Sequence, residues 1–74
     1  MSPLAREIAD LICAVGPMTI NDISRLLPPH SYNSIYSCIY REWEQGNYTF
    51  FHPDGNKPIK VYINEEYYYI YRDR

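Results

Sequence analysis

The segment from residue 31 to residue 45 carries the side chains with the clearest recognition chemistry. Asn33, Ser37 and Arg41 recur every four residues, and residues at this spacing lie on one face of a helix. An Asn amide can form two hydrogen bonds with adenine, an Arg guanidinium can pair with guanine or bind phosphate, and a Ser hydroxyl commonly bonds phosphate oxygens. This outer face carries no acidic residue before Glu44. The pattern favours binding through hydrogen bonds, and the alternative is an ordinary solvent-facing surface.

A second stripe flanks this row. Tyr32, Tyr36 and Tyr40 are also four residues apart, so they share one side of the same expected helix. Tyr is enriched at protein interfaces because it offers a large rigid contact area and a hydroxyl group at low entropic cost. The stripe could therefore bind another protein or a second copy of this chain.

Catalytic chemistry is not indicated. Glu42 and Glu44 are two residues apart and diverge on a helix, and Glu65 and Glu66 adjoin a tyrosine-rich tail without a nearby His. No nucleophile sits in a recognisable Ser, Cys or His arrangement. The three glycines are isolated from one another, so there is no glycine-rich phosphate loop. We expect no enzymatic activity and no cofactor.

A metal site or a disulfide scaffold is not indicated either. Cys13 and Cys38 have no CxxC spacing, and His30 and His52 are far from any ligand-like partner. Both cysteines fall among apolar neighbours in expected helices, where an unpaired cysteine behaves as a small hydrophobic residue. We expect two reduced thiols in the core.

Length and composition limit the possible classes. A chain of 74 residues makes one small domain, which buries only about 60% of its unfolded surface, although an aromatic content of 16% enlarges the core. No apolar run approaches the roughly 20 residues that cross a bilayer, and residues 1–4 lack the basic region of a signal peptide. We expect a soluble, cytoplasmic protein that does not contact membranes.

The charge balance counts against tight binding to DNA. Seven Lys and Arg residues oppose nine Asp and Glu residues, for a formal net charge of -2. Affinity for the phosphate backbone comes largely from cations that displace condensed counterions. Arg41 is the only Lys or Arg residue on the expected recognition helix. A dimer, which doubles the cationic contacts, therefore fits DNA binding better than a monomer.

Hydrophobic periodicity predicts three helices, over residues 3–15, 20–27 and 31–45. Ser2 and Thr19 are expected to cap the first two, and the proline pair at 28–29 ends the second. The buried stripes recur at helical spacing. In the first helix the stripe is Leu4, Ile8, Leu11, Ile12 and Val15, in the second Ile20, Ile23, Leu26 and Leu27, and in the third Ile35, Cys38, Ile39 and Trp43.

Two strands are expected after Gly46, over residues 48–52 and 59–64, where the period changes to two. Aliphatic residues alternate with Lys60, Tyr62 and Asn64 in the second strand. Asp54-Gly55 is a strong turn signal, although the connection from Pro53 to Pro58 is longer than a tight hairpin. The tyrosine-rich tail, residues 65–74, has no assignable period and could be either core or interface.

The order of an extended dipeptide at 18–19, a helix, a turn, a longer helix and a β-hairpin resembles the winged helix-turn-helix family of small bacterial and phage DNA-binding regulators. The stretch closest to the family pattern is residues 18–27 leading into residues 31–46. The resemblance covers nearly the whole chain and implies a single α+β domain with three helices and a small antiparallel wing.

The resemblance also implies which residues meet double-stranded DNA. The recognition helix would enter the major groove and the wing would engage the flanking phosphates. The expected contacts on the helix are Ser31, Tyr32, Asn33, Tyr36, Ser37, Tyr40 and Arg41, and those on the wing are His52, Asn56, Lys57 and Lys60. The expected function is that of a sequence-specific regulator or accessory DNA-binding protein of phage or plasmid type. The alternative is a winged-helix module that docks protein through its tyrosines and does not bind DNA.

Overall fold

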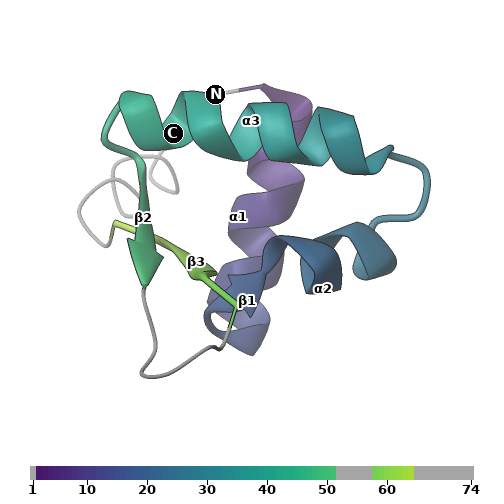
Figure 1. The fold of residues 1–74 in the computed structure, drawn as a ribbon, viewed down its shortest axis with the longest axis horizontal. Helices are drawn as coiled ribbons and strands as arrows, with labels where there is room; N and C mark the ends of the chain where they lie inside the picture. The colour runs from purple at the N-terminus through teal and green to yellow at the C-terminus, as the bar shows by residue number, and fades with distance from the viewer. Residues whose placement is uncertain (1, 52–57, 65–74) are drawn as a thin grey trace.

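The computed structural model describes residues 2–51 and 58–64. These residues form three helices and three short strands (Figure 1). In chain order they are α1 Pro3–Val15, β1 Met18–Thr19, α2 Ile20–Leu26, α3 Tyr32–Glu44, β2 Tyr48–Phe51 and β3 Lys60–Ile63. The domain is therefore α+β with a small antiparallel sheet, and each expected helix and strand is present with ends within one residue of the expected ones.

Hydrogen bonds from backbone amides to serine and threonine side chains fix where the helices begin. The Ser2 hydroxyl accepts from the Ala5 amide at 3.2 Å, and the Thr19 hydroxyl accepts from the Asp22 amide at 3.1 Å. Ser31 caps α3 in the same way, since its hydroxyl accepts from the Ser34 amide. The expected caps of the first two helices are thus confirmed, and each satisfies an amide that has no partner within its helix.

The sheet has the strand order β1-β3-β2, and both pairings are antiparallel. β3 is central: Val61 lies opposite Met18 of β1 on one side and Phe50 of β2 on the other. The sequence predicts residues 18–19 only as an extended dipeptide. In the structure they extend the sheet and tie the start of α2 to the hairpin strands.

One hydrophobic core joins the helices to the sheet. α3 runs across one side of the molecule, α1 passes behind it, and α2 lies beneath its first half (Figure 1). The largest fully buried side chains are Ile8 of α1, Ile23 of α2, Ile35 and Ile39 of α3, Tyr48 of β2 and Val61 of β3. Tyr48 also donates from its hydroxyl to the Ala5 carbonyl at 2.7 Å, which anchors β2 to the first turn of α1.

Several side chains expected in the core are exposed. Trp43 is 45% exposed. Each step of four residues advances about 40° around a helix, so Trp43, two such steps after Ile35, has turned away from the core. Cys13 is exposed, which corrects the expectation of two core thiols, whereas Cys38 is buried as expected. Val15, Leu26 and Ile59 are also exposed, since each lies at an end of its element or beyond it.

Within the described ranges, no helix combines the length and apolar character that crossing a membrane requires.

Candidate recognition surface

The row formed by Asn33, Ser37 and Arg41 lies on the solvent side of α3. All three side chains are exposed, while Ile35, Cys38 and Ile39 of the same helix are buried against the rest of the domain. Ser31 is exposed at the cap. The structure thus brings the expected helix contacts to one open surface, as the helical spacing requires.

The tyrosine stripe forms a continuous aromatic cluster with two further rings. The ring centres of Tyr36 and Tyr40 are 4.4 Å apart, and those of Tyr32 and Tyr36 are 6.2 Å apart. Tyr40 also meets Phe50 of β2 edge to face at 5.2 Å, and Trp43 stacks on Phe50 at 5.2 Å. Phe50 was not expected in this surface, because only its place in β2 brings it beside α3.

Tyr32 and Tyr36 remain 44% and 42% exposed. A hydrogen bond with Tyr36 raises the pKa of the Tyr40 hydroxyl above its usual value. Tyr40 is therefore neutral at physiological pH, since the ordinary pKa of a tyrosine is already about 10. The rings of Tyr32, Tyr36 and Tyr40 are held by neighbouring rings, which lowers the entropy lost if they bind a partner.

The burial of Glu42 is a feature that the sequence did not reveal. Its carboxylate is only 5% exposed, and the Asn47 amide donates to it at 2.6 Å. The Asn47 backbone amide also donates to the Glu42 carbonyl at 2.9 Å. The negative charge next to Arg41 in the sequence is thus turned inward, and Glu44 is the acidic side chain that α3 exposes.

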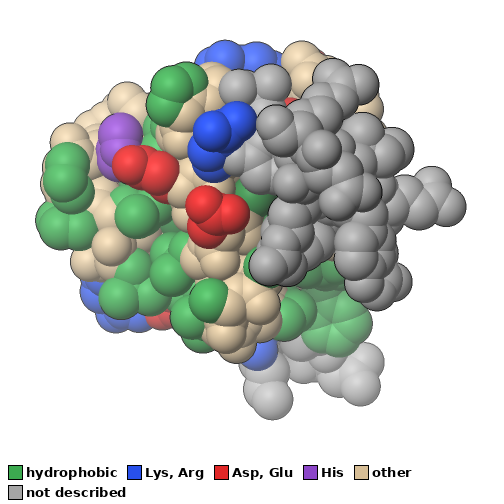
Figure 2. Space-filling view, turned by 180° about the vertical axis from the view of Figure 1, so that it is seen from behind, with side chains coloured by type: hydrophobic (Ala, Val, Ile, Leu, Met, Phe, Trp, Pro, Cys, Tyr) green, Lys and Arg blue, Asp and Glu red, His purple; other side chains and the backbone are tan. Residues whose placement is uncertain are grey.

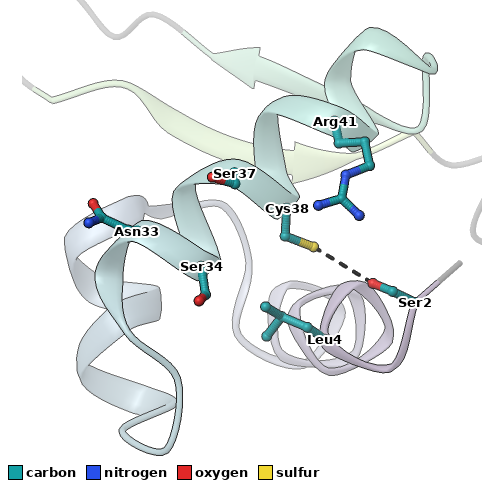
Figure 3. A pocket seen from close by; sticks show the side chains of 7 residues that line it. All are labelled: Ser2, Leu4, Asn33, Ser34, Ser37, Cys38 and Arg41. Atoms are coloured by element: carbon teal, nitrogen blue, oxygen red, sulfur yellow. Dashed lines mark hydrogen bonds between the residues drawn. The ribbon is translucent and has the colours of Figure 1, made fainter.

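An open pocket lies between the beginning of α1 and the exposed side of α3 (Figure 3). Its volume is about 380 Å³, and it is lined by Ser2, Leu4, Asn33, Ser34, Ser37, Cys38 and Arg41. The Arg41 guanidinium, the Cys38 thiol and the Ser2 hydroxyl point into the same space, whereas Asn33 projects away at the far end (Figure 3). Burial raises the pKa of the Cys38 thiol, so it is neutral in this setting.

The hairpin places Lys60 in solvent at the start of β3, opposite Thr19 and Phe51. Pro17 and Tyr62 lie near it around a second, mainly apolar pocket of about 280 Å³. The other expected wing contacts, His52, Asn56 and Lys57, lie outside the described residues, as does the tyrosine-rich tail.

Charged side chains are dispersed over the rest of the described surface. Arg25 is paired with Asp22 within α2, and His30 is hydrogen bonded to Glu7 of α1 at 2.8 Å. The face opposite to that of Figure 1 shows the histidine beside an acidic side chain, with basic groups at separate places (Figure 2). Neither of the two ion pairs between described residues includes Arg41.

The parts of the chain that the structure describes contain no cluster of His, Cys, Asp or Glu side chains that could hold a metal ion. Comparison with protein families, with curated proteins and with solved structures finds no match for this chain.

Proposed function

We propose that this chain is a winged-helix DNA-binding regulator, in which the N-terminal half of α3 enters the major groove and the β2–β3 hairpin lies on the flanking backbone. The proposal is supported above all by the exposed row of Asn33, Ser37 and Arg41 on α3. These side chains can reach base edges or phosphate oxygens, and α3 is about 20 Å long at 1.5 Å per residue. The major groove, about 12 Å wide, admits such a helix.

The inward position of Glu42 supports the same proposal. An acidic side chain beside Arg41 on the surface would repel phosphate, but Glu42 is buried and accepts a hydrogen bond from Asn47. The hydroxyls of Tyr32, Tyr36 and Tyr40 add groups that commonly bond backbone oxygens. Lys60 supplies a cation on the hairpin side of the surface.

The low number of cations favours a dimeric regulator. The chain has a formal net charge of -2, and backbone affinity grows with the number of phosphates neutralised. Two copies on a palindromic site would double the contribution of Arg41 and Lys60. The small size, by analogy, suits an accessory regulator of phage or plasmid type.

Selection from a random duplex library at low salt, followed by titration of the recovered site, tests the proposal. We expect Arg41→Gln to weaken binding about 5- to 150-fold if Arg41 reads a base, and to lower the salt slope by about 1 if it binds phosphate. Arg25→Gln is the matched control because Arg25 is already paired with Asp22 on α2. Failure to recover any bound duplex at low salt would refute the proposal.

The aromatic cluster favours a second candidate function, docking to a protein through α3 and β2. Five rings in contact, of which Tyr32, Tyr36 and Trp43 are each over 40% exposed, resemble the aromatic centre of a protein interface. In that case Tyr36→Ala would abolish a complex that tolerates salt, and Arg41→Gln would change it little. DNA binding that falls steeply with added salt and is lost in Arg41→Gln would support the first candidate, the DNA-binding regulator, instead.

A further inference from the structure

The pocket between α1 and α3 has a one-sided chemistry. Apart from Leu4 and the neutral thiol of Cys38, its lining offers one guanidinium, one amide and three hydroxyl groups, and it includes no carboxylate. A volume of about 380 Å³ lies within the range of about 300–1,000 Å³ typical of ligand pockets. A small anion is the class of ligand that such a lining attracts.

Arg41 is placed to supply the charge. Its guanidinium points toward the Ser2 hydroxyl across the gap (Figure 3), and it takes part in neither ion pair of the described residues. Arg binds phosphate and carboxylate through paired N–H groups, and such charge-assisted bonds are about twice as strong as neutral ones. Arg41 therefore does not have to break either of these ion pairs before it binds a ligand.

The serine hydroxyls can donate to the same ligand. The Ser2 oxygen accepts from the Ala5 amide at 3.2 Å, and the Ser34 oxygen accepts from the Ser31 hydroxyl at 2.9 Å. Each oxygen is thus engaged as an acceptor, which leaves its own O–H to donate. The Ser2 oxygen is 4.0 Å from the Cys38 sulfur, a weak contact that a charged acceptor would replace.

We propose that this pocket binds a phosphate group, held by Arg41 together with the hydroxyl of Ser2. Phosphate fits better than carboxylate because it presents more acceptor oxygens, in a tetrahedral array, to donors that come from two helices. The source is either a backbone phosphate of duplex DNA or a free phosphate. The first source rests on the proposed function and would fix the start of α1 on the strand beside the groove.

Ser2 allows a test that preserves the fold. Asp and Asn are both good N-cap residues, so Ser2→Asp and Ser2→Asn should each retain the cap of α1. Only Ser2→Asp places a carboxylate in the pocket. We expect Ser2→Asp to weaken phosphate binding about tenfold or more, because its carboxylate repels the phosphate. Arg41→Gln should weaken it by a similar factor, because it removes the charge-assisted hydrogen bonds. Ser2→Asn should change the affinity by less than about threefold, because its amide N–H can donate to the phosphate in place of the lost O–H.

The measurement is an amide NMR titration with inorganic phosphate at constant ionic strength, and in parallel with a selected duplex. Saturable shifts at Leu4, Cys38 and the Arg41 side chain with either probe, reduced by Ser2→Asp and not by Ser2→Asn, would support the site. Asn21→Asp adds the same charge on exposed α2 and controls for general repulsion of the duplex.

The outcomes separate this inference from the proposed function. Shifts with phosphate but no binding to any duplex would support the pocket with free phosphate as its ligand, and would refute DNA binding. Binding to duplex with no shifts in the pocket from either probe, or equal phosphate affinity in the Ser2→Asp and Ser2→Asn variants, would overturn the pocket and leave the regulator standing. No saturable shift with either probe would also overturn it.

Discussion

Replacement of Tyr48 by Phe tests the contact that sets α1 against the sheet. Tyr48 is 1% exposed, and its hydroxyl donates to the Ala5 carbonyl at 2.7 Å. Tyr48→Phe retains the ring and removes the hydroxyl that makes this bond. Because Ala5 lies within α1, its carbonyl still accepts the helical amide four residues later, and no buried acceptor is left without a donor.

The expected cost is that of one neutral hydrogen bond, about 1 kcal/mol within a range of about 0.5–1.5 kcal/mol. For a domain of this size, 1 kcal/mol corresponds to a fall of about 4–8 °C in Tm. Thermal unfolding followed by circular dichroism, with urea unfolding at fixed temperature, measures both quantities. Tyr32→Phe is the matched control, because Tyr32 is 44% exposed and its hydroxyl should contribute less than about 0.5 kcal/mol.

The same variant should also disturb the α1–α3 pocket, since the Ala5 carbonyl lies next to the wall formed by Leu4. We expect amide shifts in α1 and β2 and little change in α2. An unchanged Tm, within about 1 °C of the parent, would refute the reasoning, because a buried bond of this length cannot then be contributing to the free energy of unfolding. Equal losses in Tyr48→Phe and Tyr32→Phe would refute it as well.

Three other substitutions probe local features. Gly46→Ala should destabilise by about 1–2 kcal/mol in urea unfolding, since Gly46 has φ +81° and an added Cβ would meet no atom within 4 Å, so the cost is in the backbone alone. Asn47→Ala should cost about 1.5–3 kcal/mol in the same assay, because it removes the amide donor of a buried carboxylate, and a loss below about 1 kcal/mol would contradict this. Hydrogen bonding to Thr19 lowers the pKa of Asp22 below its ordinary value of 3.8, so its stabilising effect is present at neutral pH and is lost as the pH falls below about 4. Thr19→Val should move the titration of the Asp22 carboxyl carbon to higher pH, and an unchanged midpoint would show that the hydroxyl has no effect.

Residues close in the sequence were sufficient to predict the helices and their caps. Ser2 and Thr19 were placed correctly because an N-cap bond spans only three residues, and Gly46 closes α3 because it can adopt positive φ at no steric cost. The exposed row on α3 was predictable for the same reason. A helical period relates Asn33 to Arg41 without reference to any other element.

The burial of individual side chains depended on elements distant in the sequence. Trp43 was expected in the core, but the core side of α3 is set by where α1, α2 and the sheet lie. Cys13 was expected to be buried by its apolar neighbours in the sequence, and the structure leaves it exposed. The sequence does not indicate that Glu42 is buried, because only the fold shows that Asn47 reaches it.

The sequence by itself determined the order of the elements, the ends of the helices and the polar and aromatic rows of α3, because each depends on bonds or angles within a few residues. Only the tertiary structure decided that residues 18–19 join the sheet, that Phe50 extends the tyrosine stripe and that Ser2 meets Arg41 across a pocket. These are contacts between segments about 10 to 40 residues apart or more, whose geometry follows from the packing of one shared core.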